Sequence, residues 1–564
     1  MGIRGLLKTG GVCASQLLAW LYRLTLCFSP NMRITLKIGS ILLCVSLAAL
    51  GCGSGPATAG GIVRLIAPLS TATVTSRRPT FRWVLATGND GAHVQICRDR
   101  ACTIEVAAFD ATGSSAAPTT DLPAGTLFWR AFGRRGAATA AASSFTWEFT
   151  VGARSAPVDT SWGSTLDVNG DGFADMIVGP RVYLGGTAPS TGASMTLDNI
   201  DNLGGNFGGF YGPAGSAGDV NGDGFADFVV RDNGLPSDTV AAYVYLGSAT
   251  GLPTAPSITL NGRVGPTETG SVAGVGDVNG DGYADILVGD GYAGTGQDMG
   301  AVYLYLGGAS GSSPDPALTI TGPLARFGYS VAGAGDVNGD GYADVVVGDY
   351  GLAGVGSTPS AFAYVYLGGA NGLSATPLVA LTKPDGTSLD GITVASAGDV
   401  NGDGYADLLV GVPAGEMGGA YLYLGGPNGP PATPSSTFAG IDGEFGTVLL
   451  GAGDVDGDGY ADVVITDPGL LPGGDAPGTP GNTGVAFLYL GGAAGPSTTA
   501  SFTLVNPDSS GLTRPFQGWM GAGDVNGDGY ADITAAVLGN TSFGYVFLGS
   551  GSGTVLPTPS ITLE

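Results

Sequence analysis

One nine-residue segment recurs seven times along this chain, and it limits the possible folds more than any other feature. The copies begin at Asp167, Asp219, Asp277, Asp336, Asp399, Asp454 and Asp524, at intervals of 52 to 70 residues. Every copy reads Asp-Val-Asn-Gly-Asp-Gly-(Phe/Tyr)-Ala-Asp, except that the sixth has Asp456 in place of Asn. A period of this length is typical of a repeat architecture in which each copy contributes one structural unit.

Each copy carries oxygen-bearing side chains at positions 1, 3, 5 and 9, and these suit a hard cation. The two glycines allow the tight bend that brings the oxygens together. The main-chain carbonyl of position 7 can join them, and Ca²⁺ takes about six to eight oxygen ligands. A single copy would be ambiguous because Asx-rich turns also form for local reasons.

Seven copies predict up to seven Ca²⁺ sites. The predicted ligands are Asp167, Asn169, Asp171, Phe173, Asp175, Asp219, Asn221, Asp223, Phe225, Asp227, Asp277, Asn279, Asp281, Tyr283, Asp285, Asp336, Asn338, Asp340, Tyr342, Asp344, Asp399, Asn401, Asp403, Tyr405, Asp407, Asp454, Asp456, Asp458, Tyr460, Asp462, Asp524, Asn526, Asp528, Tyr530 and Asp532.

The segment differs from the helix-flanked calcium loops. An EF-hand needs a bidentate Glu at position 12 and a following helix, but position 12 is apolar here, as at Val178 and Val347. Dockerin modules share the opening of the segment and also continue into a helix. The residues that follow here form a short β-branched run, so we expect the segment to join two β-strands.

The acidity of the chain comes largely from these segments. The formal net charge is −26 over 564 residues, and 22 of the 47 acidic residues lie in the seven copies. Seven Ca²⁺ ions would offset about 14 of these charges. Because excess negative charge repels phosphate backbones, we expect no nucleic acid partner.

Residues 1–52 are expected to be a signal peptide with a lipobox. Residues 32–37 form a positive n-region, with Met32 as an alternative start, and residues 38–50 form an apolar h-region. Ala49-Leu50-Gly51-Cys52 resembles the lipobox of bacterial lipoproteins, which implies lipidation of Cys52. An ordinary signal peptide or an uncleaved anchor is the alternative. We expect export to the outer membrane or cell surface, held by this lipid, or secretion.

The remaining cysteines agree with export. Once Cys52 is used, Cys97 and Cys102 are left as a pair five residues apart. A local disulfide is expected in an oxidising compartment, and two buried thiols are the alternative. A zinc site is disfavoured because His93 is the only histidine of the chain.

Two parts precede the repeats. Residues 53–62 are expected to form a flexible linker. Residues 63–153 lack the Asp segment and contain alternating strands separated by turn signals, which favours an antiparallel β-sandwich. The runs around Trp83 and Trp129 resemble fibronectin type III and related immunoglobulin-like modules. Both tryptophans are expected in the core, and the module is expected to be a spacer or accessory domain.

Each repeat predicts four short strands. In the fourth they are residues 327–335, 343–348, 363–368 and 377–381. Four strands joined in sequence form one antiparallel blade, and seven blades close radially into a β-propeller. An open β-solenoid is the alternative, although its repeats are usually shorter.

Residues before the segments carry a further pattern, Phe-Gly followed by Gly-Ala-Gly, as at residues 327–335 and 445–453. This pattern resembles the FG-GAP repeat of integrin α-subunit propellers and of many bacterial surface proteins. The resemblance covers residues 157–564 and implies an all-β, seven-bladed propeller with calcium between the first and second strands of each blade. The first blade departs from the pattern, since residues 177–183 leave almost no loop between strands two and three.

Strand alternation places the calcium hairpins on one propeller face and the long loops 231–240, 290–300, 349–361 and 467–484 on the other. Loops on a rigid scaffold are where binding usually resides. Aromatic residues near them could contact a protein or a glycan: Phe207, Phe210, Tyr211, Tyr292, Tyr350 and Trp519. Calcium in an exported module is usually structural.

Three functions are compatible with these features. We favour a surface-anchored, calcium-binding adhesion or ligand-binding module. The alternatives are a polysaccharide lyase or hydrolase on a propeller scaffold and a passive structural surface protein. We expect no enzyme, because the chain after residue 52 has one His, His93, and one Lys, Lys383, and lacks a nucleophile–base motif. The identity of the ligand and the need for a partner protein stay open.

Overall fold

The computed structural model describes residues 37–38, 41–42, 61–68, 72–74, 77–98, 102–123, 125–144, 146–151, 161–162, 166–169, 171, 173–198, 214–221, 223, 225–231, 240–262, 270–279, 283–291, 299–338, 340, 342–349, 363–382, 392–403, 405–413, 418–440, 444–456, 458, 460–468, 485–505, 507, 518–526, 528, 530–537, 543–550 and 558–563. All elements in these ranges are β-strands, and nearly all pair in antiparallel fashion. A search of these same ranges finds no helix with the length and apolar character of a membrane span.

The chain divides into two compact units, Met1–Thr58 and Ala59–Glu564. In the first unit, β1 (Lys37–Ile38) and β2 (Ile41–Leu42) form a small antiparallel pair. The second unit holds every other strand. The expected leader, residues 1–52, and the linker, residues 53–62, lie almost entirely outside the described residues, as does Cys52.

Two sheets at the start of the second unit share one hydrophobic core. The smaller contains β3 (Arg64–Ala67), β5 (Phe81–Val84) and β8 (Ser115–Ala116). The larger runs in the order β12 (Ser161–Trp162), β4 (Ala72–Val74), β11 (Trp147–Val151), β9 (Gly125–Arg135), β6 (Gly91–Cys97) and β7 (Glu105–Thr112), and β10 (Ala138–Ser143) pairs with β9.

Tryptophans from both sheets meet in this core. Trp83 and Trp129 are fully buried, which confirms the prediction that both are core residues. Each ring nitrogen satisfies its hydrogen bond inside the protein: Trp83 Nε1 donates to the carbonyl of Gly113, and Trp129 Nε1 to that of Pro68, each at 3.0 Å. A buried indole needs such a partner because an unsatisfied N–H is costly.

Seven further sheets follow in chain order, and we number them 1 to 7. Sheet 1 contains β13 (Met176–Val178), β14 (Arg181–Tyr183) and β15 (Met195–Thr196). Sheets 2 to 4 contain β16 (Ala214–Gly218), β17 (Asp227–Arg231), β18 (Val240–Tyr245) and β19 (Ile258–Asn261); β20 (Val272–Gly276), β21 (Asp285–Asp290), β22 (Met299–Tyr305) and β23 (Leu318–Ala325); β24 (Phe327–Gly335), β25 (Asp344–Asp349), β26 (Ala363–Tyr366) and β27 (Val379–Leu381).

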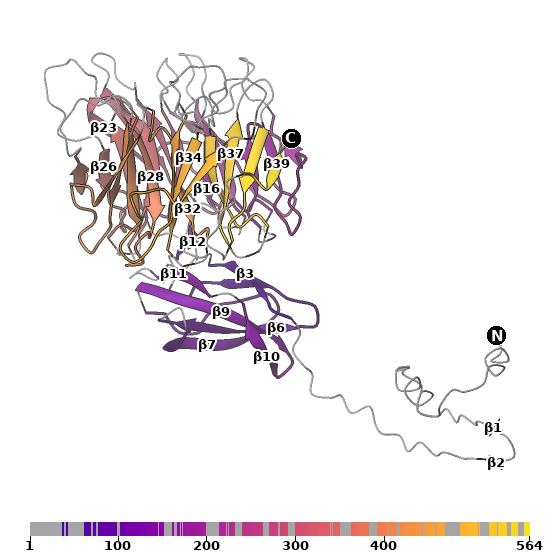
Figure 1. Ribbon diagram of the computed structural model, residues 1–564. Coiled ribbons are helices and arrows are strands. Elements are labelled where there is room, and N and C mark those ends of the chain that lie inside the picture. The colour runs from indigo at the N-terminus through magenta and orange to yellow at the C-terminus, as the bar shows by residue number, and fades with distance from the viewer. Residues whose placement is uncertain are drawn as a thin grey trace. The chain divides into compact units, whose positions relative to one another are not determined.

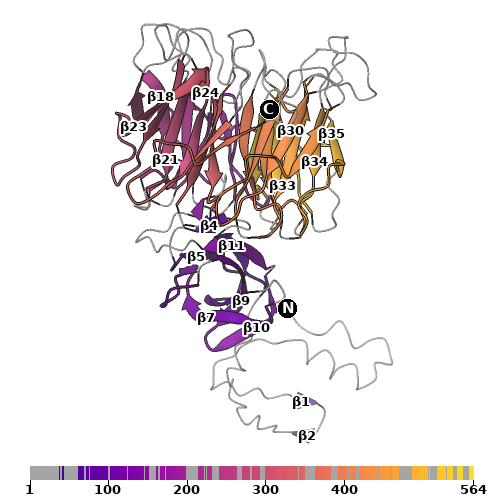
Figure 2. The ribbon, with the colours of Figure 1, turned by 90° about the vertical axis from the view of Figure 1, so that its left-hand side faces the viewer.

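Sheets 5 to 7 have the same plan. They contain β28 (Thr393–Gly398), β29 (Asp407–Val412), β30 (Gly419–Tyr423) and β31 (Ser436–Ala439); β32 (Leu449–Gly453), β33 (Asp462–Asp467), β34 (Val485–Tyr489) and β35 (Phe502–Val505); β36 (Gly518–Gly523), β37 (Asp532–Val537), β38 (Phe543–Phe547) and β39 (Ile561–Leu563). In sheets 2 to 7 the four strands are hydrogen-bonded in chain order, as predicted for the repeats. Figures 1 and 2 show these strands standing side by side along a common direction.

Burial explains the composition of the strands. Every residue of β25 is buried, because this strand is covered by neighbouring sheets on both faces, and its β-branched run suits that position. The fourth strands, such as β19 and β31, bury only one residue in four and leave the outer edge exposed.

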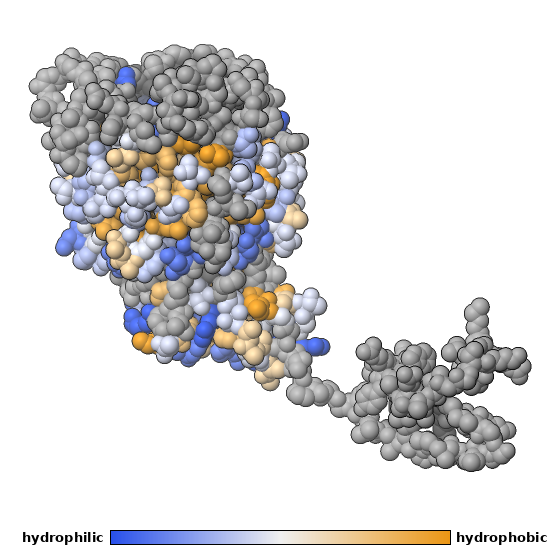
Figure 3. Space-filling model, in the orientation of Figure 1, coloured by the Kyte–Doolittle hydropathy of each residue, from blue (hydrophilic) through white to orange (hydrophobic). Residues whose placement is uncertain are grey.

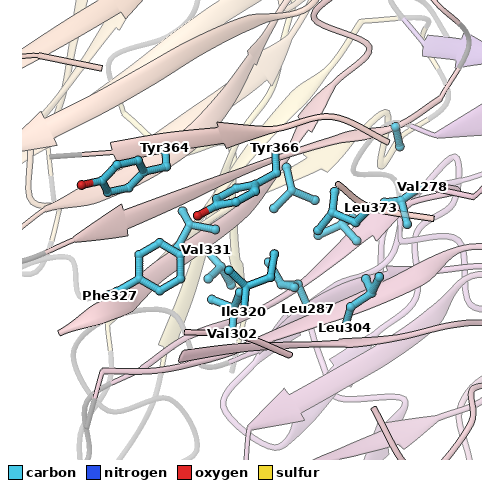
Figure 4. Packing of buried hydrophobic residues seen from close by; sticks show 14 residues of the cluster. Val278, Leu287, Val302, Leu304, Ile320, Phe327, Val331, Tyr364, Tyr366 and Leu373 are labelled. Atoms are coloured by element: carbon cyan, nitrogen blue, oxygen red, sulfur yellow. The ribbon is translucent and has the colours of Figure 1, made fainter. Parts of the chain in front are cut away.

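Apolar side chains link each sheet to the next. One cluster joins sheets 3 and 4 through residues such as Leu304, Ile320, Phe327 and Tyr366 (Figure 4). Corresponding clusters join sheets 1 and 2, 2 and 3, 4 and 5, 5 and 6, and 6 and 7. A seventh joins sheet 7 back to sheet 1, through Val546 and Leu563 on one side and Val178 and Tyr183 on the other.

The first repeat departs from the predicted four-strand plan. Sheet 1 has three strands in the described part of the chain. The segment before its Asp loop, β12, pairs instead with β4 of the preceding domain, with Ser161 opposite Val74 and Trp162 opposite Thr73. The short connection between strands two and three is as predicted, because β13 ends at Val178 and β14 begins at Arg181.

Candidate metal centres in the repeated loops

In sheets 2 to 7, the Asp segment joins the first and second strands of its sheet. In sheet 4, β24 ends at Gly335 and β25 begins at Asp344, so positions 1 to 8 of the segment form the loop and position 9 opens the next strand. The hairpin position predicted from the sequence is therefore present. A register shift before the loop, between Gly333 and Gly335, releases the backbone from the ladder.

The loop folds its side-chain oxygens inward. In sheet 4, the N–H of Asp340 donates to Asp336 Oδ1 and to Asn338 Oδ1, each at 3.0 Å. The N–H of Tyr342 donates to Asp340 Oδ1, and Asn338 Nδ2 donates to Asp340 Oδ2 at 2.9 Å. The loops that begin at Asp167, Asp219, Asp399 and Asp524 repeat this pattern. Positions 1, 3 and 5 thus come together in one turn in these five loops.

Position 9 has a second role that the sequence did not reveal. The carboxylate of Asp344 is fully buried and accepts two backbone hydrogen bonds, from Val337 to Oδ2 and from Gly368 to Oδ1, each at 2.9 Å. It therefore ties the start of the loop to the end of the third strand. All seven copies make this pair of bonds, at 2.7 to 2.9 Å, through Asp175, Asp227, Asp285, Asp344, Asp407, Asp462 and Asp532.

The buried carboxylates hold protons more tightly than ordinary Asp. Burial raises the pKa of Asp175 to about 7 and that of Asp227 to about 8, although backbone hydrogen bonds act in the opposite direction. Burial and, next, the charge of Asp336 raise the pKa of Asp344 well above its usual range. Clustered carboxylates without a cation are expected to behave in this way.

The sixth loop has the densest set of carboxylates. Asp454, Asp456 and Asp462 each offer an oxygen within 4.8 Å of the others, and all three side chains are buried or half-buried. Burial and the neighbouring Asp458 raise the pKa of Asp456. An all-oxygen, carboxylate-rich donor set fits Ca²⁺ and does not fit soft, sulfur-seeking metals.

The loops also connect neighbouring sheets through the backbone. The carbonyl of each position 1 accepts from the N–H of position 8 in the next sheet, and these seven bonds measure 2.9 to 3.1 Å. The last of them runs from Ala174 of sheet 1 to Asp524 of sheet 7. A second bond, from Gly186 to the carbonyl of Val525, joins the same two sheets at 2.9 Å. The closing contact, which the sequence left open, is thus made by the seventh loop.

Two glycine positions permit this close approach. A Cβ at Gly368, two residues after the third strand, would collide with the carbonyl oxygens of Ala343 in its own sheet and Val278 in the preceding sheet. Gly335, immediately before the loop, has a φ of 88° and faces the Cβ of Ala406 in the next sheet. The small Ala at position 8 is therefore needed for packing as much as the Asp residues are needed for the loop.

Of the remaining predicted site residues, the structure describes some and leaves others out. Cys97 and Cys102 form a disulfide with a Cα–Cα distance of 5.1 Å. Asp281 lies outside the described residues, as do most of the long loops proposed for ligand binding and their aromatic residues Phe207, Phe210, Tyr211, Tyr292 and Tyr350. Trp519 lies in β36.

Buried charges at the far end of the second strands escaped the sequence reasoning. Asp290, Asp349 and Asp467 end β21, β25 and β33, and each is at most 1% exposed. Arg231 ends β17 and is also buried. In the sequence, each is the charged residue that closes an apolar run directly before a long connecting segment.

Comparison with known proteins identifies the repeats. The FG-GAP-like repeat family matches residues 201–288 and 399–465, and the FG-GAP repeat family matches residues 327–366. Human integrin α-6 is 34% identical over 154 residues, which are 27% of this chain and 13% of that protein. Human integrin α-IIb is 34% identical over 155 residues, which are 25% of this chain and 14% of that protein. The matched part is thus about an eighth of the relatives' length.

The solved structures that align over most of the chain include rhamnogalacturonan lyases. The enzyme YesW covers 87% of this chain and 90% of its own, with a TM-score of 0.31 and 14% identity. The Bacillus licheniformis lyase covers 89% and 92%, with a TM-score of 0.35 and 13% identity. At these scores the alignments support no conclusion about activity.

The sheets and the loops between them define an all-β protein of the β-propeller class. Within that class, this chain contains FG-GAP repeats, matched in residues 201–288, 327–366 and 399–465, and these repeats are similar to those of integrin α subunits.

Proposed function

We propose that this chain is an exported, calcium-stabilised, seven-bladed propeller that presents a ligand-binding face at the cell surface. The observation that supports it most is the double role of each Asp loop. Its side chains form an oxygen-rich turn, and its first two carbonyls bond the next sheet. A cation that organises the loop would therefore also stabilise the contact between blades.

The ring of seven blades is supported by the packing between sheets. Seven apolar clusters accompany seven sheets, and one of them joins the last sheet to the first. An open solenoid would leave its two end sheets unpaired on one side. Closure also removes exposed sheet faces that would otherwise need capping.

Bound Ca²⁺ would supply the positive charge that offsets the clustered carboxylates. The residues to hold it are positions 1, 3, 5 and 9 with the carbonyl of position 7, as predicted. Position 9 already accepts backbone hydrogen bonds on both oxygens, but each carboxylate oxygen can accept more than one contact. We assign the ions a structural role, as is usual for exported modules.

The ligand face is proposed at the ends of the propeller away from the Asp loops. The second strands lead from the Asp loops to that end, and four of them close there with a buried charge, at Arg231, Asp290, Asp349 and Asp467. A rigid base under variable loops is the usual arrangement of a binding surface. We propose a protein or glycan ligand there, no catalysis, and anchoring through lipid on Cys52.

The test is a calcium titration of the purified chain, with bound metal and thermal unfolding followed together. Binding of several ions, with an unfolding temperature that falls sharply in chelator, is expected. If no Ca²⁺ binds, or if chelator leaves the unfolding temperature unchanged, the calcium assignment is wrong. A glycan and protein array then tests the ligand face, and the variant Cys52→Ala tests membrane association.

A further inference from the structure

The large sheet of the domain at residues 63–153 carries a row of aromatic and polar side chains on one face. Strand β9 alternates buried and half-buried residues, and the half-buried ones are Phe128, Arg130, Phe132 and Arg134. Alternate residues of a strand lie about 7 Å apart, so the row is about 20 Å long. Strand β6 adds His93, opposite Phe132, and Gln95, opposite Arg130. These six residues are called the β9 row below.

Arg130 is held in place at the centre of the row. Its Nε donates to Gln95 Oε1 at 2.8 Å, and its guanidinium carbon lies 5.4 Å from the centre of the Phe132 ring. Gln95 Nε2 donates in turn to Glu105 Oε2 at 2.7 Å. Among the described residues, the two terminal nitrogens of Arg130 make no hydrogen bond or ion pair. An ordered guanidinium with its fork available can receive a carboxylate at little entropic cost.

A second fixed group lies at the end of the row. Asp110 accepts from His93 Nδ1 at 2.7 Å and pairs with Arg134 Nη1 at 3.3 Å. The His93 and Phe132 rings lie 6.0 Å apart. Because Nδ1 of His93 donates to Asp110, its other ring nitrogen remains as an acceptor for a hydroxyl of a ligand.

The charge of this domain differs in sign from that of the propeller. Residues 63–153 contain nine Arg and six acidic residues, whereas residues 157–564 contain six basic and 41 acidic residues. Hydrophilic and hydrophobic residues also lie side by side on this domain (Figure 3). An anionic ligand is therefore repelled by the propeller and attracted by the domain that precedes it.

We propose that the β9 row binds an acidic polysaccharide. Sugar rings have apolar faces that pack on aromatic side chains such as Phe128 and Phe132. Uronate carboxylates match the planar fork of Arg130, and hydroxyls match Gln95 and His93. A straight row along one strand suits an extended chain of sugars better than a compact protein epitope.

The experiment is calorimetric titration of hyaluronate oligosaccharides into the calcium-loaded full chain. Chitooligosaccharides, which lack carboxylates, are the neutral control. We expect hyaluronate to bind, Arg130→Ala to weaken binding by about tenfold or more, and Arg130→Lys to weaken it less, because lysine keeps the charge but loses the fork. The matched control Arg82→Ala removes an exposed arginine from the other sheet, and we expect less than a twofold effect.

Three results would overturn the proposal. The first is the absence of hyaluronate binding by the wild-type chain. The second is an equal loss in Arg130→Ala and Arg82→Ala, since binding would then follow net charge alone. The third is self-association of the chain in sedimentation that Arg130→Ala abolishes while sugar binding is unchanged, which would make the row a contact between protein copies. Unfolding temperatures of all variants must match the wild type within a few degrees.

Discussion

At the scale of single residues, the Asp segment combines two kinds of chemistry that its sequence presents as one. Positions 1, 3 and 5 face the loop's own backbone, as Asp336, Asn338 and Asp340 do. Position 9 instead links two connections of the sheet. The buried carboxylate of Asp344 accepts backbone hydrogen bonds from Val337, in the Asp loop, and from Gly368, after the third strand. An ordinary Asx turn needs no such residue. The buried Asp at position 9 of all seven copies therefore serves the packing of the sheet and not only the shape of the turn.

Replacement of position 9 should therefore cost more than replacement of a surface carboxylate. Asp344→Asn keeps the shape but turns one acceptor into a donor that faces a backbone N–H. We expect a loss of roughly 2–4 kcal/mol in the free energy of unfolding, measured by denaturant titration. The control Asp198→Asn, at an exposed position, should change it by less than about 0.5 kcal/mol. Similar losses for both variants would contradict the assigned role.

Asp456 is the natural variant among the seven loops, and it allows a test in the opposite direction. Asp456→Asn removes one of the carboxylates clustered with Asp454 and Asp462 and restores the residue of the other six copies. We expect a higher unfolding temperature in chelator, because like-charge repulsion falls. In saturating Ca²⁺ the gain should shrink or reverse. A lower unfolding temperature in chelator would show that the sixth loop is not strained by its charge.

At the scale of elements, neighbouring sheets pack closely because glycine occupies the positions where they meet. A glycine lies two residues after the third strand of each repeat, where an added Cβ would collide with carbonyl oxygens of two neighbouring sheets. The second strand is apolar because it is covered on both faces, whereas the fourth strand alternates because one edge is exposed. The hydrophobic pattern of each strand thus follows its degree of burial.

Gly368→Ala tests this contact directly. The added methyl would collide with carbonyl oxygens of two sheets, and we expect a loss of about 1–3 kcal/mol or more in the free energy of unfolding. Gly369→Ala is a matched control one residue away, where the nearest atom to an added Cβ is the Gly372 oxygen at 3.9 Å. Comparable melting curves for the two variants would mean that the sheets can shift apart without cost.

At the scale of the whole molecule, closure joins the first sheet to the last through Asp524 and Val525. In the proposed closed ring, loosening one contact would expose the flanks of two sheets. Removal of cations should consequently weaken the whole ring in one transition rather than blade by blade.

The raised pKa values predict opposite pH dependences with and without calcium. Because the folded pKa values of Asp175 and Asp227, about 7 and about 8, lie above the usual value of 3.8, the metal-free fold binds these protons more tightly than the unfolded chain. Stability in chelator should be greatest near pH 4 and fall as the pH rises through 7 to 8. With Ca²⁺ present, protons compete with the ion, so stability should fall as the pH is lowered. Parallel curves from thermal unfolding would refute this reasoning.

The features that could be predicted from the sequence are those that depend on one strand or one turn at a time. The hairpin position of the Asp segment, the four strands of repeats two to seven and the core tryptophans Trp83 and Trp129 all follow from local spacing and alternation, which one strand or one turn already contains. The inward fold of positions 1, 3 and 5 is likewise a property of a nine-residue turn.

Only the tertiary structure decided the rest, because it depends on residues brought together from different repeats. The sharing of β12 with the preceding domain, the bond from Ala174 to Asp524 and the collision that forbids a side chain at Gly368 each require knowing which sheet lies next to which. The burial that raises the pKa of Asp344 is likewise visible only in the folded structure, where its side chain is fully buried.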